Sequence, residues 1–332
     1  MTNERHEKGN DYLVYFYSTP AFMFQVIPVA YMFLTSKHED TYLHALLRLR
    51  QLGLHGKTFL TDFEPALMNA TQRVFGRLHG FSLHGCLIHF VFRVHEAVGT
   101  LHLTEFFRDT PSALVMLRRM SALPRLPAAQ MGEGFTAVWQ QFRHTNPDHY
   151  PTVFPFLMYF HNQWMVRVKP RRLSVYQLYH TTTNNVETNH RHFRRFITTP
   201  VPNAWDVTAA IQQVHQQATL TLGRFQGNLP TGRLRGQPLI MSASRVRRAE
   251  RRLAAGGGGA DVLQFLDTVS HAMENVIRDL ERWAVPAERD QVPADGVGPP
   301  LPEDEPNDPN VPPPPPQPPG DQGVVIDDDQ QN

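Results

Sequence analysis

The sequence has one cysteine, no uninterrupted long apolar run and no leader-like N-terminus. A single cysteine among 332 residues excludes an internal disulfide and fits a reducing compartment. The most apolar stretch, residues 12–33, is interrupted by Ser18, Pro20 and Pro28. It therefore falls short of the roughly 18 consecutive apolar residues that span a membrane. Because a basic, apolar and small-residue signal pattern is also missing, we expect an intracellular protein without a membrane segment.

Acidic side chains are scarce in most of the chain and crowded at its end. Before residue 286 there are 31 basic and 20 acidic side chains, a net charge of +11. Residues 286–332 hold 1 basic and 11 acidic side chains, a net charge of −10. A basic body indicates a polyanionic partner such as DNA, and hence a nuclear location. The alternatives are a basic surface that serves solubility, and an acidic tail that masks the body.

A strand, a helix and a second strand are predicted between residues 57 and 90. Residues 58–60 are β-branched or large and apolar, and they lead directly to Asp62. Pro65 suits the first turn of a helix, which Asp62 or Thr61 can cap. Residues 83–90 are predicted to form the second strand. Such a unit pairs its strands in parallel through a right-handed crossover, which places Asp62 at the carboxyl edge where ligands bind.

The preceding residues add elements of the same kind. Residues 11–34 are rich in aromatic and β-branched side chains and predict one or two strands, broken near Pro20. Residues 26–34 form the clearer strand pattern. A helix is expected from residue 38 to residue 52, and Gly53 ends it.

This order of elements, together with TDFEPALMNATQRVF and the following HGCLIHF, resembles the core of a Mutator-like element (MULE) transposase domain. The resemblance implies an α/β fold of the ribonuclease-H-like type, a mixed sheet with flanking helices, and an Asp-Asp-Glu metal site. It makes Asp62 the second aspartate and identifies Cys86 and His89 as the family's Cys-x-x-His motif. TTNNVETNHRHF resembles the closing motif and implies Glu187 as the third carboxylate. The resemblance covers roughly residues 26–222.

The first aspartate of that family lies in an Asp-Gly-Thr-Phe-like strand, which this sequence lacks. Asp11 is the one candidate, and a solvated residue near a terminus is the alternative interpretation. Three carboxylates around two Mg²⁺ or Mn²⁺ ions would carry out DNA cleavage and strand transfer. Because two carboxylates without the third bind metal poorly, we expect a truncated or rebuilt domain without catalytic activity.

Cys86 and His89 have two interpretations of their own. They could be zinc ligands. On a strand, however, residues i and i+3 point to opposite faces, so the two side chains could not share a metal without a bend. We therefore expect a buried structural pair.

The predicted domain plan has four parts. Residues 11–222 form the transposase-like domain, with an all-helical insertion at about 91–178. Residues 223–260 form a flexible basic arm with a glycine hinge. Residues 261–284 form an amphipathic helix that must pack on the body or on a partner. Residues 285–332 form a disordered, acidic, proline-rich tail with polyproline II character.

Two function hypotheses follow. The first is a transposase-derived DNA-binding protein; the alternative is a catalytically dead scaffold that acts through its C-terminal helix and proline-rich tail. A solvated arm or a nuclear-import signal would explain the arginines equally well, and the sequence leaves homo-oligomer formation open. The arginines expected to bind nucleic acid phosphates are Arg191, Arg194, Arg195, Arg245, Arg247, Arg248, Arg251 and Arg252.

Overall fold

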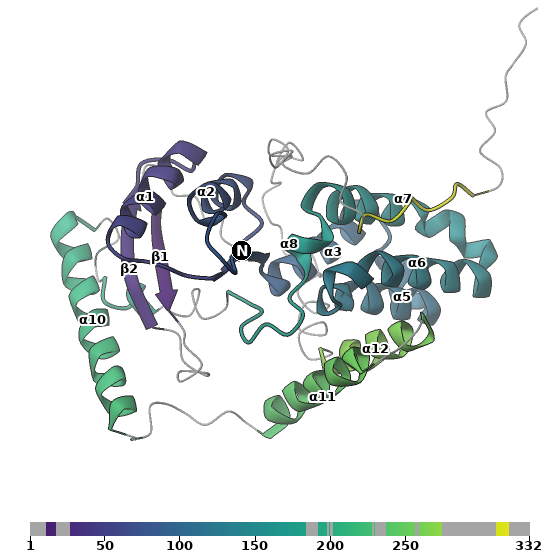
Figure 1. Cartoon of the computed structure of the whole chain (residues 1–332). Coiled ribbons are helices and arrows are strands. Elements are labelled where there is room, and N and C mark those ends of the chain that lie inside the picture. The colour runs from purple at the N-terminus through teal and green to yellow at the C-terminus, as the bar shows by residue number, and fades with distance from the viewer. Residues whose placement is uncertain are drawn as a thin grey trace, which may run out of the picture. The chain divides into compact units, whose positions relative to one another are not determined.

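The structure is a computed structural model that describes residues 11–17, 27–183, 192–197, 199, 202–227, 229, 237–255, 259–273 and 310–318. The described chain is a mixed α/β protein in which helices predominate (Figure 1). It divides into two compact units. The first consists of residues 1–89, 177–241 and 292–303, and the second of residues 90–176, 242–291 and 304–332. All described strands belong to the first unit.

Two pairs of strands form the β-structure of the first unit. β1 (Asp11–Tyr17) and β2 (Ile27–Leu34) are antiparallel. β3 (Thr58–Thr61) and β4 (Ser82–Gly85) are parallel, which confirms the pairing predicted for the strand-helix-strand unit. Among the described residues, the two pairs are not joined by hydrogen bonds into one sheet.

Helices α1 (Glu39–Gln51) and α2 (Pro65–Phe75) pack on each other over a core that includes the fully buried Leu46 and Phe75. Gly53 follows α1 with a φ of +97°, a conformation that glycine adopts without strain, so the predicted end of this helix is confirmed. Pro65 occupies the predicted first turn of α2. The N-cap is Glu64, however, so the prediction that Asp62 or Thr61 caps this helix is wrong.

The prediction of a second strand over residues 83–90 is correct only for its first half. β4 ends at Gly85, and α3 (Leu87–Thr100) begins two residues later, so His89 lies in the first turn of a helix. The buried residues Leu87, Phe90, Val91 and Val94 have the i, i+3, i+4, i+7 spacing of a helix. A short apolar run does not by itself distinguish a buried strand from a buried helix, so the prediction of one strand over residues 83–90 is wrong from Leu87 onward.

The second unit is built from helices where the sequence predicts an all-helical insertion. They are α3 from Phe90 onward, α4 (Thr104–Asp109), α5 (Pro111–Ala122), α6 (Ala128–Thr145), α7 (Tyr150–Phe160) and α8 (Pro170–Leu173), with 3-10 turns at Leu123–Arg125 and Pro147–His149 and a π-helical segment at His161–Val168. Its core is aromatic. Phe160 stacks on Phe135 with ring centroids 5.5 Å apart, and Phe90 packs edge-on against both Phe160 and Trp164.

The sequence predicts a flexible arm at residues 223–260, but much of this segment is helical. α10 (Ala204–Gln226) extends into this segment, and α11 (Gln237–Ala254) is a helix of 18 residues. α12 (Gly259–Ala272) packs on α5 and α6, so the predicted amphipathic helix packs on the body of the protein. The Arg119 guanidinium donates two hydrogen bonds to Asp267 of α12, at 2.6 and 2.8 Å.

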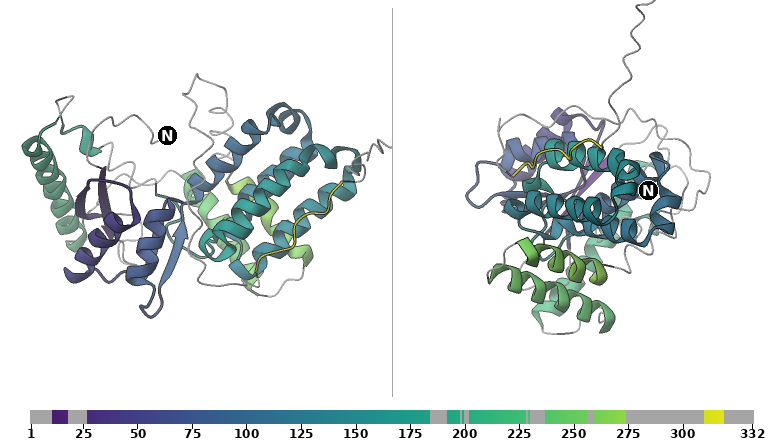
Figure 2. Two further views of the ribbon diagram at one scale, coloured as in Figure 1. Left: turned by 90° about the horizontal axis from the view of Figure 1, so that it is seen from above. Right: turned by 90° about the vertical axis from the view of Figure 1, so that its right-hand side faces the viewer.

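The prediction of a disordered tail is wrong for residues 310–318, which lie against the second unit (Figure 2). Residues 285–309 and 319–332 are outside the described part of the chain. Within the described part, no helix is both long enough and apolar enough to cross a membrane.

Candidate functional site

Asp62 lies where the sequence predicts it, directly after β3 and at the carboxyl end of the parallel strand pair. Its side chain is half exposed. In sheets with parallel strands this edge is where ligands and reacting groups gather, because the strands end there together.

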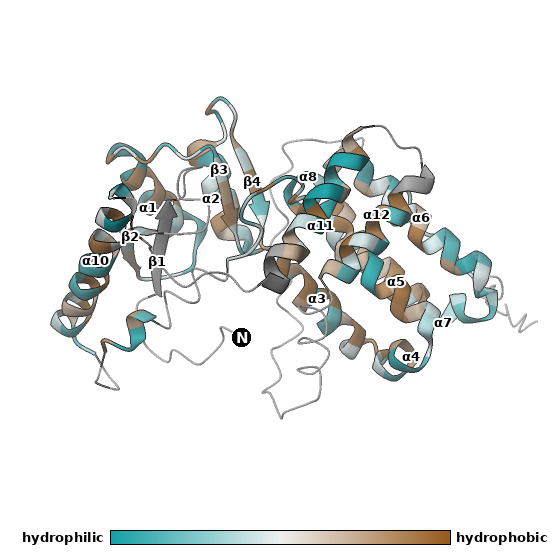
Figure 3. Ribbon diagram, turned by 90° about the horizontal axis from the view of Figure 1, so that it is seen from below, coloured by the Kyte–Doolittle hydropathy of each residue, from teal (hydrophilic) through white to brown (hydrophobic). Residues whose placement is uncertain are grey.

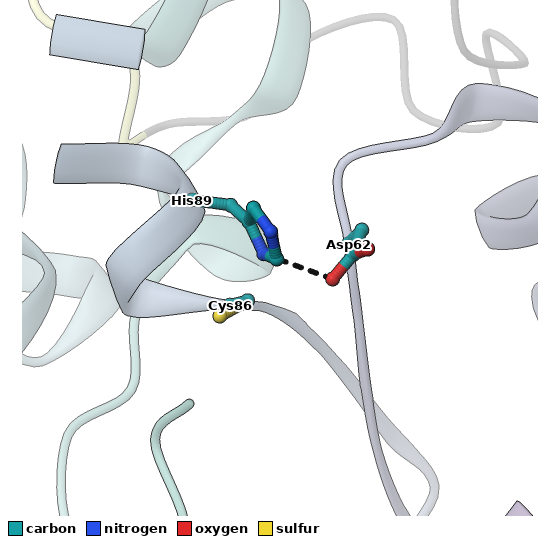
Figure 4. A group of neighbouring side chains, drawn as sticks. All are labelled: Asp62, Cys86 and His89. Carbon is teal, nitrogen blue, oxygen red and sulfur yellow. Dashed lines mark ion pairs between the residues drawn. The ribbon is translucent and has the colours of Figure 1, made fainter. Parts of the chain in front are cut away.

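Cys86 and His89 approach Asp62 from the neighbouring strand. The register pairs Thr61 with Gly85, and the Cys86 N–H donates to the Thr61 carbonyl at 2.8 Å. The first turn of α3 then brings His89 back toward β3, with its Nδ1 atom 3.0 Å from Asp62 Oδ1. Figure 4 shows the three side chains converging from the loop after β3, the end of β4 and the start of α3.

Thr183 completes this group from a distant part of the chain. Its hydroxyl lies 3.1 Å from Asp62 Oδ1, 3.2 Å from Cys86 Sγ and 3.4 Å from His89 Nδ1. Its N–H also donates to Cys86 Sγ, and the Leu87 N–H donates to the Thr181 carbonyl at 2.9 Å. Sequence reasoning missed Thr183 as a site residue. Its one signal is its place in the TTNNVE segment, four residues before Glu187.

The charges of the group are set by its mutual contacts. Burial lowers the pKa of His89, but the hydrogen bonds and charges of Asp62 and Cys86 outweigh burial and raise it to about 10. Burial raises the pKa of Cys86, but the neighbouring His89 and Thr183 outweigh that effect and lower it. At neutral pH His89 is therefore a cation held between the Asp62 carboxylate and the Cys86 sulfur atom.

The donor atoms of Asp62, Cys86 and His89 all lie within 4.8 Å of one another. The objection that residues i and i+3 diverge does not apply, because His89 is on a helix. A sulfur, a nitrogen and an oxygen are donors that zinc accepts, whereas Mg²⁺ and Mn²⁺ prefer oxygen alone. These three residues could therefore hold a zinc-type ion, which would have to displace the proton on His89 Nδ1.

A role for Cys86 as a nucleophile is not supported by its surroundings. The residue is fully buried, and Thr183 contacts its sulfur atom. A thiolate needs access to its substrate as well as a lowered pKa. The sulfur atom of Cys86 is therefore closed to a substrate.

Several predicted site residues are not placed. Glu187 and Arg191 lie outside the described residues, and for Asp11 the structure describes only the backbone of β1. Of the three carboxylates that the resemblance implies, Asp62 is the one whose side chain is described. The structure therefore brings Asp62 together with the Cys-x-x-His motif.

The arginines expected to bind nucleic acid are exposed wherever they are described. Arg194 and Arg195 belong to the first unit, next to the buried Phe193. α11 buries Val246, Ala249 and Leu253, so its arginines share the opposite side of the helix. They are Arg245, Arg247, Arg248, Arg251 and Arg252, which we call the α11 arginine face. Figure 3 shows hydrophilic residues, in teal, along this helix.

Comparisons with protein-family models, with curated proteins and with solved structures found no match to this chain. The fold and the site define a mixed α/β protein with a carboxylate, an imidazole and a thiol grouped at the carboxyl end of two parallel strands.

Proposed function

We propose that this chain is a DNA-binding protein derived from a MULE-type transposase, with a ribonuclease-H-like core, and that it no longer cuts DNA. One observation carries the proposal: three segments of the resemblance meet at one point. Asp62 follows the β3 strand, Cys86 and His89 form the Cys-x-x-His motif, and Thr183 belongs to the closing motif. The contact between Asp62 and Thr183 joins residues 121 positions apart in sequence.

The loss of cleavage is argued from the surroundings of Asp62. Two-metal catalysis needs several carboxylates that are free to bind cations. Here Asp62 Oδ1 accepts a hydrogen bond from Thr183 and faces the His89 cation at 3.0 Å. A metal ion would have to displace that cation, and the sequence lacks the Asp-Gly-Thr-Phe strand of the first aspartate.

The α11 arginine face is the proposed DNA contact. Arginines on one side of a helix can neutralise the phosphates along one stretch of DNA without reading its sequence. The helix is ordered through Val246, Ala249 and Leu253, so the charges are displayed on a fixed surface. Binding through such a surface weakens steeply as salt is raised.

The test is binding and nicking of duplex DNA by the full chain across a salt series, with and without Mn²⁺. Replacing Arg248 and Arg252 together by glutamine should reduce the salt slope by about two, roughly one unit for each phosphate that is no longer neutralised. The control replaces Arg93 and Arg108, two exposed arginines of the same unit, and changes the net charge equally. It should leave the slope nearly unchanged.

Each result has a clear meaning for the proposal. Binding without nicking supports it. Mn²⁺-dependent nicking that Asp62→Ala abolishes would show a live site and contradict the claim that cleavage is lost. No binding even at low salt would exclude the DNA-binding role and leave the scaffold hypothesis. Under the scaffold hypothesis, α12 would not present an apolar surface to a partner, because its apolar side already packs on α5 and α6.

A further inference from the structure

The proline run of the tail contacts the second unit with a regular period. Pro312 and Pro315 are buried, whereas Pro313, Pro314 and Pro316 are exposed. A repeat of three residues is the period of the polyproline II helix, in which every third residue faces the same side. The segment therefore presents one side of such a helix to the protein.

The protein supplies hydrogen-bond donors for this segment. Proline has no N–H, so a proline run can only accept hydrogen bonds through its carbonyl groups. His161 Nε2 lies 2.8 Å from the Pro312 carbonyl, and the Tyr150 hydroxyl donates to the Pro316 carbonyl at 2.7 Å. Because a carbonyl oxygen cannot donate, Nε2 of His161 carries a proton in this contact.

Both donors are buried where the segment covers them. With the segment in place, Tyr150 is 1% exposed and His161 is 5% exposed. Arg143 lies over the Tyr150 ring at 5.3 Å. The donors sit at opposite ends of α7, so the segment runs antiparallel to this helix. The yellow trace in Figure 2 lies alongside helices of the second unit.

α6 forms the other wall. Four small residues and two longer polar ones line a cavity together with the start of the segment: Ala129, Gly132, Glu133, Thr136, Ala137 and Gln140. A methyl group added at Gly132 would lie 2.8 Å from the backbone oxygen of Asn310. The missing side chain at Gly132 therefore lets the two backbones approach.

We infer that α6, α7 and His161 form a binding groove for a polyproline II peptide, and that the chain's own residues 310–318 occupy it. The matched features are the burial period of three, the two donors aimed at Pro312 and Pro316, and the backbone approach at Gly132. A proline run is already extended before it binds, so little conformational entropy is lost on docking. Grooves that bind proline-rich peptides elsewhere use the same physics.

The experiment measures binding of a fluorescent peptide of residues 308–319, DPNVPPPPPQPP, to the full chain by anisotropy. In the unaltered chain the tethered segment competes at a high effective concentration. Replacing Pro312 and Pro315 by aspartate should empty the groove, because two charges would have to be buried. Replacing the exposed Pro313 and Pro314 by aspartate is the matched control, with the same composition and charge.

We expect the P312D/P315D chain to bind the peptide at least about tenfold more tightly than the unaltered chain or the P313D/P314D chain. Adding Gly132→Ala to P312D/P315D should weaken that binding about tenfold, because the new methyl group meets the peptide backbone. Alanine is the better helix former, so this loss would not come from an unfolded α6.

Three results would overturn the inference. The first is equal peptide binding by all three chains, or binding by none. The second is unchanged binding after Gly132→Ala. The third is self-association of the unaltered chain that P312D/P315D abolishes, which would place the segment on a second copy rather than on its own chain.

Discussion

The Thr183 hydroxyl lies 3.1 Å from Asp62 Oδ1, although 121 positions separate the two residues in the chain. The same oxygen lies 3.2 Å from Cys86 Sγ and 3.4 Å from His89 Nδ1. A hydroxyl has one proton to donate and lone pairs to accept. Thr183 therefore links an acceptor, a thiol and a cation that come from three different elements.

Thr183→Val should destabilise the protein. Valine has nearly the same shape but no hydroxyl, so the half-exposed Asp62 and the buried Cys86 lose a hydrogen-bond partner, at a cost of about 1–3 kcal/mol. Thr183→Ser keeps the hydroxyl and should cost less, because it removes one methyl group. Urea denaturation of the two variants and the unaltered chain measures the difference. Equal stability of the valine and serine variants would show that the hydroxyl does not contribute.

Asp62→Asn should lower the pKa of His89. The carboxylate is the strongest contact that opposes burial and holds this pKa at about 10, so its removal lets burial act more strongly. We expect a fall of more than about one unit, measured by NMR titration of the His89 ring in the full chain. Asp40→Asn, at an exposed position of the same unit, is the control and should leave the titration unchanged.

The contact between Asp62 and His89 also predicts how the stability of the protein depends on pH. Because the pKa of His89 is higher in the folded state, its contribution is complete below about pH 6.5 and is lost as the pH rises toward 10. Asp62→Asn should therefore lose less stability than the unaltered chain between pH 7 and pH 10. An identical loss in both chains would contradict the assignment of the pKa to this contact.

Local signals in the sequence predict a good part of the first unit. Pro65 and Gly53 mark helix boundaries by their backbone preferences, and the apolar residues before Asp62 mark a strand. The prediction of one strand over residues 83–90 is wrong because an apolar run this short fits a strand or a helix equally well. The change from strand to helix at Cys86 depends on how the chain turns after its pairing with β3, and local sequence does not predict that turn.

The site is predicted only in part, for a physical reason. The place of Asp62 follows from the end of a strand, but the contact of Thr183 depends on the path of the chain through the whole second unit. The arginine-rich segment forms a helix because Val246, Ala249 and Leu253 are buried along one side of it. Composition alone favours a solvated arm there.

Asp267→Asn should loosen α12. Arg119 is nearly buried, with a side chain 13% exposed, and it donates two hydrogen bonds to the Asp267 carboxylate. Without that charge the guanidinium keeps its burial but loses its counterion, at a cost of about 1–2 kcal/mol. Hydrogen exchange of α12 and urea denaturation measure the effect. Asp109→Asn breaks the exposed contact with Arg108 and should change neither.

His95 should make the protein sensitive to mild acid. Burial lowers the pKa of His95 to about 4, and among the described residues its Nε2 atom has no hydrogen-bond partner. In the unfolded chain His95 binds a proton near pH 6.5, whereas in the folded chain it stays neutral until about pH 4. The free energy of unfolding therefore falls as the pH drops from 7. Between pH 7 and pH 5 the loss should be about 2 kcal/mol.

His95→Leu isolates this effect, because leucine fills a similar space and does not titrate. Its stability should fall less between pH 7 and pH 5 than that of the unaltered chain, measured by urea denaturation at both values. His144→Gln removes an exposed histidine of the same unit and should leave the acid-induced loss as it was. If His95→Leu and the unaltered chain lose stability in parallel, the acid sensitivity arises from other groups, and His95 is protonated in the folded protein as readily as in the unfolded one.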